Sequence, residues 1–387
     1  MSEQEARRHR ARVWGAARRR LSYSPGEATV GRRLRELADW AEADDCADLP
    51  LDAYGDGPVE ELEQRVADVL GLPAAVFFPT GTLAQQVALR CWSGRTGSPV
   101  VALHPLAHPE VHEGGALSTV SGLRTVHLTD EPRPPTAEEV RGHTEPFGTL
   151  MLELPLRDAG FVLPTWEELV DVVEAARERD AVVHVDGARL WECAPHFGRG
   201  LREIAGLADS VYVSFYKSLG GISGAALAGP VDVMEEARVW RHRYGGLLFQ
   251  QFPAAVAALR GLAVELPRLP SYVAHARVVA DGLRAGFEEA GVPWFRVHPE
   301  TPQTHQFQVW LPYPHEALTA ASLALTEETD AVLFRRWSPP SAGGPPGVAM
   351  TEVTVGEPGL AWTRDDVREA VGAFLARVRR PAESGPR

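Results

Sequence analysis

WEELVDVVEAARERDAVVHVDG, residues 166–187, is the stretch that decides the fold of this chain. Its first part, residues 166–179, places apolar side chains at helical spacing, and residues 181–185 follow as a short apolar run. A helix that leads directly into a buried strand is typical of a parallel α/β sheet, because each strand needs a crossover to reach its parallel neighbour. The stretch ends on Asp186 and Gly187, so a carboxylate closes a buried strand.

The same alternation of helix and strand continues on both sides of this stretch. Further apolar strands are predicted at residues 74–78, 100–103, 150–154 and 210–215, and further helices at 59–70 and 83–91. Short apolar strands separated by helices of about ten residues or more are typical of a doubly wound, mostly parallel sheet. The sequence therefore predicts a large α/β domain over residues 51–267.

After residue 267 the strict alternation ends. A helix at 272–290, strands at 294–297, 306–311 and 348–355, and a final helix at 364–379 indicate a smaller α+β domain over residues 268–380. A Pro- and Gly-rich loop is expected at 338–347 and a frayed tail at 381–387. Residues 1–50 are expected to form an N-terminal arm with helices.

The composition excludes several classes of protein. With 387 residues, 44% hydrophobic and 24% charged, the chain is an ordinary globular protein that needs no disulfide or metal to fold. Its formal net charge of −13 argues against nucleic acid as a partner, and no apolar run is long enough to span a membrane. The three cysteines, Cys46, Cys91 and Cys193, show no metal-ligand spacing, which favours reduced, buried thiols in a cytosolic protein.

Seven arginines crowd into residues 7–20 and form a local exception to the acidic balance. A targeting peptide is often arginine-rich, but this segment has no apolar h-region and contains Glu3 and Glu5 beside the arginines. A solvated helix face, or an arm that docks on a neighbouring subunit, explains the segment better.

Three polar features fall at predicted strand ends, where a doubly wound sheet presents its ligand crevice. The first is Thr80, Gly81 and Thr82, which lie between a strand and a helix. Backbone N–H groups and the helix dipole attract an anion at such a position. A threonine cap before a helix is also common for purely structural reasons, so this feature alone is weak.

The other two features are an acid and a lysine. Asp186 ends a buried strand and needs a cationic or donor partner, for which a pyridinium nitrogen and the nearby Arg189 are equally suited. Lys217 follows a strand of β-branched and aromatic residues and precedes Gly220 and Gly221. A lysine at such an edge is usually solvated, but burial would lower its pKa and favour imine chemistry. Together, an anion cradle, an acid and a lysine supply the phosphate, ring-nitrogen and aldehyde partners of pyridoxal 5′-phosphate.

The order of these motifs closely resembles the threonine aldolase/β-eliminating lyase family of fold-type-I pyridoxal-phosphate enzymes. The matching segments are Tyr54-Gly55-Asp56, Phe78-Pro79-Thr80-Gly81-Thr82, Ala107-His108 with Gly114-Gly115, His184-Val185-Asp186-Gly187-Ala188-Arg189, and Ala208-Asp209-Ser210 leading to Lys217. The resemblance covers residues 52–265, with looser similarity to the end. It implies a PLP-dependent transferase-like large domain and a cytoplasmic homodimer or homotetramer that acts on an amino acid.

The resemblance also implies a role for each matching residue. Lys217 would carry the cofactor as a Schiff base, and Asp186 would keep the ring nitrogen protonated. His108 is similar to the histidine that stacks on the ring and takes the proton of the β-hydroxyl group. The remaining cofactor contacts would come from Thr80, Gly81, Thr82, Ser214 and Arg189, of which Arg189 would also lie near the substrate.

Several segments depart from the family's pattern. Residues 22–49 hold no counterpart of its Asp-Thr segment, residues 153–157 (Glu-Leu-Pro-Leu-Arg) replace its Glu-Asn-Thr-His segment, and residues 248–250 (Leu-Phe-Gln) replace its Met-Arg-Gln segment. Where the family carries an arginine for the substrate carboxylate, residues 348–352 read Val-Ala-Met-Thr-Glu. Such a contact orients the substrate as well as attracting it. Arg335 or Arg336 would substitute for it, unless both are ordinary surface arginines.

Three functions follow from this pattern. The first is a lyase that breaks the Cα–Cβ bond of a β-hydroxy-α-amino acid and releases glycine and an aldehyde. The second keeps the cofactor but breaks or makes another bond, by β-elimination, transamination or C–C coupling, because the changed carboxylate contact alters which Cα bond is activated. The third is a non-catalytic binding protein, which the joint presence of Lys217, Asp186 and His108 disfavours.

Overall fold

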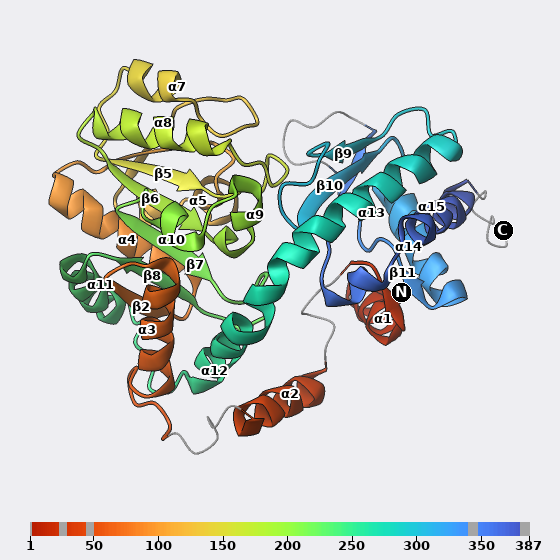
Figure 1. The fold of residues 1–387 in the computed structure, drawn as a ribbon, viewed down its shortest axis with the longest axis horizontal. Helices are drawn as coiled ribbons and strands as arrows, with labels where there is room; N and C mark the ends of the chain where they lie inside the picture. Colours follow the sequence, from red (N-terminus) through yellow and green to blue (C-terminus); the bar gives the residue numbers. More distant parts are fainter. Residues whose placement is uncertain (1, 23–28, 44–49, 340–346, 380–387) are drawn as a thin grey trace. The chain divides into compact units, whose positions relative to one another are not determined.

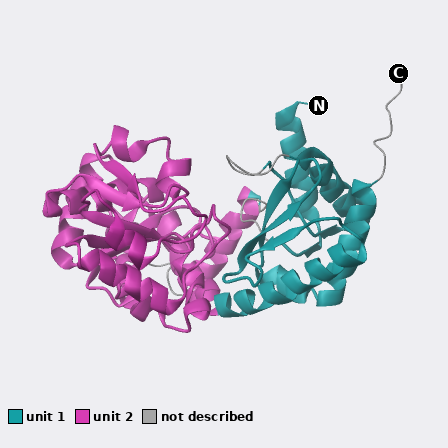
Figure 2. Cartoon of the chain, turned by 90° about the horizontal axis from the view of Figure 1, so that it is seen from above, with its two compact units in different colours: residues 1–29, 268–387 teal, residues 30–267 magenta. Residues whose placement is uncertain are grey.

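The structure is a computed structural model that describes residues 2–22, 29–43, 50–339 and 347–379. The chain divides into two compact units (Figure 2): a large unit, Val30–Pro267, and a small unit, Met1–Thr29 with Arg268–Arg387. The segment 1–50, expected as an arm of its own, is shared between the two units. Most of the loop expected at 338–347, the tail expected at 381–387, and Cys46 lie outside the described residues.

The large unit is built on a seven-stranded sheet in the order β2-β8-β7-β6-β5-β3-β4 (Figure 1). In that order the strands are Ala74–Phe78, Ala225–Gly229, Ser210–Ser214, Val182–Gly187, Thr149–Glu153, Val100–Leu103 and Arg124–His127. The five strands from β7 to β4 are parallel, whereas β8 is antiparallel to both of its neighbours, β2 and β7. The mostly parallel, doubly wound sheet predicted from the sequence is therefore confirmed.

Helices cover the sheet of the large unit. On one face α4 (Gly81–Thr96) and α11 (Val231–Arg243) share a core cluster with alternate residues of β2 and β8. The intervening residues of these strands, such as Phe77 and Ala226, are buried as well. Strands buried on both faces read as continuous apolar runs, which is the pattern of the sequence.

The other helices of the large unit precede its strands, connect them or follow the last one. The α-helices are α2 (Val30–Ala43), α3 (Pro58–Leu70), α5 (His108–His112), α6 (Ala116–Thr119), α7 (Ala137–Gly142), α8 (Trp166–Arg177), α9 (Ala194–Phe197), α10 (Leu201–Ala205) and α12 (Phe252–Arg260). The short 3₁₀ helix η2 (Leu190–Glu192) follows β6, and a π-helical turn, η3 (Gly261–Glu265), follows α12. The predicted helices at 59–70, 83–91 and 166–179 thus correspond to α3, α4 and α8.

The small unit contains a three-stranded antiparallel sheet in the order β12-β10-β9, with strands Ala349–Thr354, Gln306–Leu311 and Arg296–His298. Its helices α13 (Leu269–Glu289), α14 (His315–Thr329) and α15 (Arg364–Val378) share one hydrophobic core with this sheet. The N-terminal segment adds α1 (Glu3–Ala16) and β1 (Arg19–Arg20), which pairs in parallel with β11 (Ala331–Val332). The smaller α+β domain predicted from the sequence is confirmed.

The arginine-rich segment forms a helix with a solvated face. Ser2 and Glu5 cap the start of α1 reciprocally, and Arg7, Arg8 and Arg12 on this helix are exposed. The helix attaches to its unit through Trp14, which is buried against Val332. The described part of the segment therefore agrees with a solvated helix face.

Two of the three cysteines can be placed. Cys91 and Cys193 are free and buried, as predicted, and burial raises the pKa of the Cys91 thiol to about 12. In the described ranges, no helix combines the length and the hydropathy that a membrane span requires.

Candidate active site

Lys217 lies in the reversal that joins β7 to β8. The Phe215 N–H donates to the Gly224 carbonyl (3.2 Å), and the Gly221 N–H donates back to the Phe215 carbonyl (2.7 Å). These bonds close the reversal and hold the half-buried Lys217 at the carboxyl edge of the sheet. Burial, followed by the positive charge of Arg189, lowers the pKa of Lys217 to about 8. The lysine is thus suited to react as a neutral amine near physiological pH.

Asp186 closes β6 at the same edge. It is buried, its Oδ1 accepts a hydrogen bond from the Ala188 N–H (3.1 Å), and burial raises its pKa. The nearby positive charge of Lys217 opposes that rise more than any other group does. From the sequence, a pyridinium nitrogen or Arg189 was predicted as the charged partner of Asp186. The structure shows that Lys217 is a further positive charge near this carboxylate. The Arg189 guanidinium lies over the ring of Phe161, 5.2 Å from its centroid.

Glu153, a residue not predicted at the site from the sequence, ends β5 directly beside Asp186. The two residues are register partners in neighbouring parallel strands. Burial, followed by the charge of Asp186, raises the pKa of Glu153 to about 7. A signal was present in the sequence, because each of two predicted buried strands has an acid at its carboxyl end. Parallel neighbours place such acids together.

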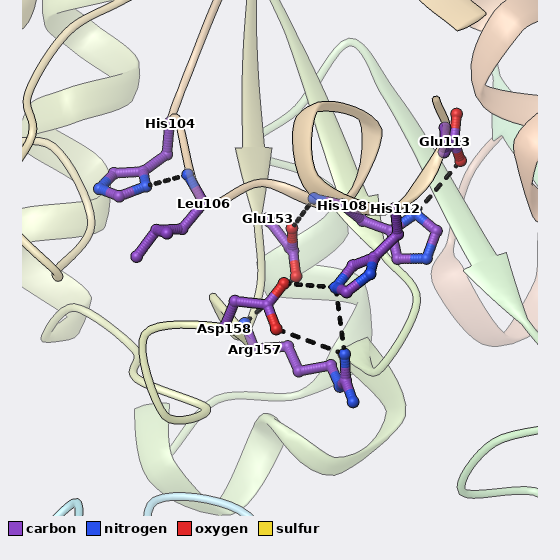
Figure 3. Close-up of polar contacts among 8 residues, drawn as sticks. All are labelled: His104, Leu106, His108, His112, Glu113, Glu153, Arg157 and Asp158. Carbon is purple, nitrogen blue, oxygen red and sulfur yellow. Dashed lines mark hydrogen bonds and ion pairs between the residues drawn. The ribbon is translucent and has the colours of Figure 1, made fainter. Parts of the chain in front are cut away.

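His108 begins α5 and is fixed by two acids (Figure 3). Its backbone N–H donates to Glu153 Oε2 (2.7 Å), and its ring Nδ1 lies 3.2 Å from Glu113 Oε1. The His112 ring packs beside it at a centroid distance of 5.1 Å. His108 lies close enough to Asp186 to lower the pKa of that acid, so the structure brings the predicted histidine to the same edge.

The predicted anion cradle begins α4. The Thr80 hydroxyl accepts from the Leu83 N–H (3.2 Å) as the helix N-cap, and Thr82 is exposed. Gly81 is buried against Tyr212, where an added Cβ would lie 2.0 Å from the phenol oxygen. Tyr212 is in turn the register partner of Asp186 on β7. The N-terminus of this helix therefore adjoins the strand ends that carry the acid and the lysine.

Three remaining predicted residues lie elsewhere or have other contacts. The Ser214 hydroxyl is buried and donates to the Ala188 carbonyl (3.0 Å), which ties the end of β7 to the turn after β6. Arg335 and Arg336 belong to the small unit. Their roles in binding substrate, and that of Ser214 in binding the cofactor, stay predictions.

The donors at this edge fit pyridoxal phosphate. A buried carboxylate suits a protonated ring nitrogen, because the positive charge of the ring would offset the burial that raises the pKa of Asp186. A lysine with a lowered pKa suits an aldehyde, and a helix N-terminus suits a phosphate. Glu113 adds a buried oxygen, Oε2, that has no hydrogen-bond partner among the residues that the structure describes. Within the described parts of the chain, no group of His, Cys, Asp and Glu side chains is arranged to hold a metal ion.

Similarity to known proteins extends over most of the chain. A low-specificity L-threonine aldolase of Escherichia coli O157:H7 is 32% identical over 275 residues, which are 69% of this chain and 80% of the relative. Two solved structures cover 95% of this chain and 99% of their own. One, from Exiguobacterium sp. 255-15, is described as a candidate aromatic amino acid β-eliminating lyase/threonine aldolase (34% identity, TM-score 0.84). The other, from Listeria monocytogenes EGD-E, is described as a candidate L-allo-threonine aldolase (31% identity, TM-score 0.83).

These similarities confirm the fold-type-I architecture and the lyase class that the sequence predicts. The family model described as β-eliminating lyase matches residues 42–305, a range that includes every side chain placed at the sheet edge above. The chain therefore belongs to the β-eliminating lyase family, whose enzymes use pyridoxal phosphate.

Proposed function

We propose that this protein is a pyridoxal-phosphate-dependent aldehyde lyase that cleaves a β-hydroxy-α-amino acid into glycine and an aldehyde. The observation that carries the proposal is the convergence of Lys217, Asp186 and His108 at one sheet edge, with Glu153 between them. The resemblance of the chain to low-specificity L-threonine aldolases supports this choice of reaction.

Each of these residues has a distinct task in the proposal. Lys217 would bond to the cofactor aldehyde, Asp186 would hold the ring nitrogen, and the backbone at Gly81 and Thr82 would bind the phosphate. When bound, pyridoxal phosphate supplies an electron-accepting ring that stabilises negative charge at the substrate Cα. As a neutral amine that can take up and release a proton, Lys217 would also return a proton to the substrate Cα.

His108 is the residue that would take the proton of the β-hydroxyl group. With Nδ1–H donated to Glu113, the nitrogen that remains to accept a proton is Nε2. Glu153 holds the backbone of the same residue, so both the ring and its attachment are fixed. A histidine positioned in this way typically contributes a factor of about 10² to 10⁴ to the rate as a general base.

Substrates and products test the proposal directly. The holoenzyme is supplied with threonine, allo-threonine and phenylserine, and both the aldehyde and glycine are measured. At least one of the three should yield equal amounts of both products, and Lys217→Ala should yield neither. Release of ammonia and a keto acid in place of glycine would instead assign β-elimination, and no aldehyde from any of the three would contradict the aldolase function.

We also propose that the protein works as a homodimer or homotetramer in the cytoplasm, on a small amino-acid substrate and without nucleic acid or membrane partners. The exposed aromatic residues Tyr54 and Phe249 support self-association, because exposed apolar side chains in contact with one another mark interaction surfaces. The net charge of −13 and the reduced state of Cys91 and Cys193 agree with this environment.

A further inference from the structure

The loop between β5 and α8, residues 154–165, starts immediately after Glu153 and is well ordered by its own contacts. The Arg157 N–H donates to Glu153 Oε1 (3.2 Å), and the Arg157 carbonyl accepts from Gly160 (2.8 Å) and Phe161 (3.2 Å). Leu156 and Val162 then pair through reciprocal backbone hydrogen bonds of 2.9 and 3.3 Å. The path of this loop is thus fixed from the sheet edge outward.

The side chain of Arg157 is held in place by a histidine and an aspartate (Figure 3). Its Nη1 lies 3.3 Å from His112 Nε2 and 3.4 Å from Asp158 Oδ1. His112 Nε2 in turn lies 2.6 Å from Asp158 Oδ2, so the three groups form a closed triangle. A ring nitrogen that donates to Asp158 cannot also accept from Arg157, so Asp158 is the hydrogen-bonding partner that the two basic side chains share. A guanidinium carries five N–H donors in a rigid fork, and one oriented through Nη1 can present another edge to a carboxylate.

Two arginines, Arg157 in this loop and Arg189 after β6, act on Lys217 through their positive charges. Both Arg157 and Arg189 lie close enough to Lys217 to lower its pKa. Arg189 itself stacks on Phe161, which belongs to the same loop. The loop therefore places positive charge beside the position at which the amine of a substrate must bind. An α-amino acid carries its carboxylate one carbon away from that amine.

We propose that Arg157 binds the α-carboxylate of the amino-acid substrate, held in position by His112 and Asp158. The inference rests on the proposed function, because it concerns the substrate of the same site. Residues 348–352 contain no arginine at the place where the family carries one for the substrate carboxylate. The proposal assigns this contact to residues 153–157, which also differ from the family's pattern. Arg189, whose guanidinium packs on the ring of Phe161, would attract the substrate carboxylate electrostatically. It would not form a second pair of parallel hydrogen bonds with that carboxylate.

The test is ligand binding by the holoenzyme, followed through the visible absorbance of the cofactor. Glycine, which carries both an amine and an α-carboxylate, is compared with methylamine, which carries only the amine. In Arg157→Gln, glycine affinity should fall about 10- to 100-fold, the usual range for loss of a charged hydrogen-bonded contact, while methylamine affinity changes less than about threefold. Arg157→Lys, which keeps the charge but not the fork, should recover part of the loss.

Control variants show whether the effect is specific to Arg157. Arg133→Gln removes an arginine that pairs with Glu139 and should change neither affinity. His112→Gln and Asp158→Asn should each weaken glycine binding less than Arg157→Gln does, because they only orient the guanidinium. Cofactor content and circular dichroism establish that each variant is folded.

Glycine binding tests the role of Arg157, and aldehyde formation tests the proposed aldolase function, so the two proposals can fail separately. If threonine, allo-threonine and phenylserine give no aldehyde but glycine binding still depends on Arg157, the aldolase function is wrong and the carboxylate site stands. The proposal about Arg157 is overturned if Arg157→Gln binds glycine as tightly as the wild type, if it loses both ligands equally, or if the wild type binds no glycine. Loss of glycine binding in Arg189→Gln alone would assign the contact to Arg189 instead.

Discussion

At the scale of single residues, the reactivity of Lys217 depends on four charged neighbours. Burial and the guanidinium groups of Arg189 and Arg157 lower its pKa, while the carboxylates of Asp186 and Glu153 raise it. The balance of these effects is a pKa of about 8, so roughly half of the lysine is neutral at pH 8. A solvated lysine with a pKa near 10.4 would be less than about 1% neutral at that pH.

Bond formation between Lys217 and the cofactor aldehyde should follow this titration, because only the neutral amine is nucleophilic. We expect the rate of cofactor uptake by the apoprotein to rise with pH and to reach half its maximum near pH 8. Glu153→Gln removes a negative neighbour and should move the midpoint to lower pH. Arg157→Gln removes a positive neighbour and should move it to higher pH. Stopped-flow absorbance measures these rates.

The opposite signs of the two shifts are the control for this experiment. A loss of local structure would slow uptake in both variants without moving their midpoints in opposite directions. A wild-type midpoint near pH 10 would show that Lys217 is solvated in the apoprotein and would contradict the burial described above.

Residues at strand ends were the part of the site that the sequence could supply. Asp186 and Lys217 follow apolar runs of recognisable strand character, so their place at the carboxyl edge is a consequence of sheet geometry. Glu153 was accessible by the same argument. His108 begins a short helix in a sequence with no strand signal, and only the family resemblance selected it. The triangle around Arg157 depends on contacts across 45 residues of sequence, which no local pattern contains.

At the scale of secondary structure, the N-terminus of α4 depends on a glycine without a side chain. A Cβ at Gly81 would lie 2.0 Å from the Tyr212 phenol oxygen, and both residues are buried. The same helix contains Gly94, whose added Cβ would meet nothing within 4 Å. The two glycines thus form a matched pair within one helix.

Gly81→Ala should lower the free energy of unfolding by about 1 to 3 kcal/mol, because Tyr212 or the helix must shift to accommodate the methyl group. It should also weaken retention of the cofactor phosphate at the displaced helix N-terminus. Gly94→Ala should be neutral or stabilising by up to about 1 kcal/mol, since alanine is the better helix former. Urea denaturation and phosphate-dependent cofactor binding measure both effects. Equal stability of the two variants would show that Gly81 is not packed as described.

Two strands of the large sheet, β8 and β4, were not predicted from the sequence because their local propensity is weak. β8 reads Ala-Ala-Leu-Ala-Gly and β4 reads Arg-Thr-Val-His, and neither has the run of β-branched and aromatic residues that marks the other strands. β8 forms because β2 and β7 pair with it on both sides, and its small side chains leave room for α4 and α11. Strand formation here is imposed by tertiary pairing, which local propensity does not report.

At the scale of the whole molecule, exposed aromatic residues of the large unit are the surface at which the proposed self-association would occur. Tyr54 and Phe249 are each 59% exposed, their ring centroids lie 5.4 Å apart, and the neighbouring Leu248 is 45% exposed. The Tyr54 N–H donates to the Phe249 carbonyl (2.9 Å), which holds the two aromatic residues together. We call these three residues the aromatic patch.

Light scattering should give a mass of two or four times the 42.1 kDa chain. Phe249→Asp places a charge in the aromatic patch and should weaken association at least about tenfold, since buried aromatic anchors dominate interface energies. Val231→Asp is the matched control, because Val231 is also exposed but begins α11, where an acid is favourable. A wild type that is monomeric at all concentrations would exclude the association.

The sequence predicted only part of the division into two units, because the rest depends on pairing between segments that lie far apart in the chain. The division after residue 267 coincides with a change of sequence texture. The association of Met1–Thr29 with the C-terminal residues does not, because it depends on β1 pairing with β11 and on Arg19 reaching Asp366. Such pairings join segments more than 300 residues apart and leave no periodic signal in either one.

Because β8 runs antiparallel to β7, the segment that carries Lys217 is a short connection between two paired strands. It should therefore tolerate fewer mutations than the loop that carries Arg157. Lys217 lies in a short reversal, residues 215–224, that two paired strands hold at both ends, so an inserted or deleted residue there would displace the lysine from its place at the sheet edge. Arg157 lies in a crossover loop whose far end continues into a helix, so changes of its side chains leave the strand register of the sheet intact. Descendants of such an enzyme can therefore acquire new substrates by mutation of the crossover loop while they inherit the same chemistry. A library of variants confined to residues 154–165 would explore specificity without loss of the reactive lysine.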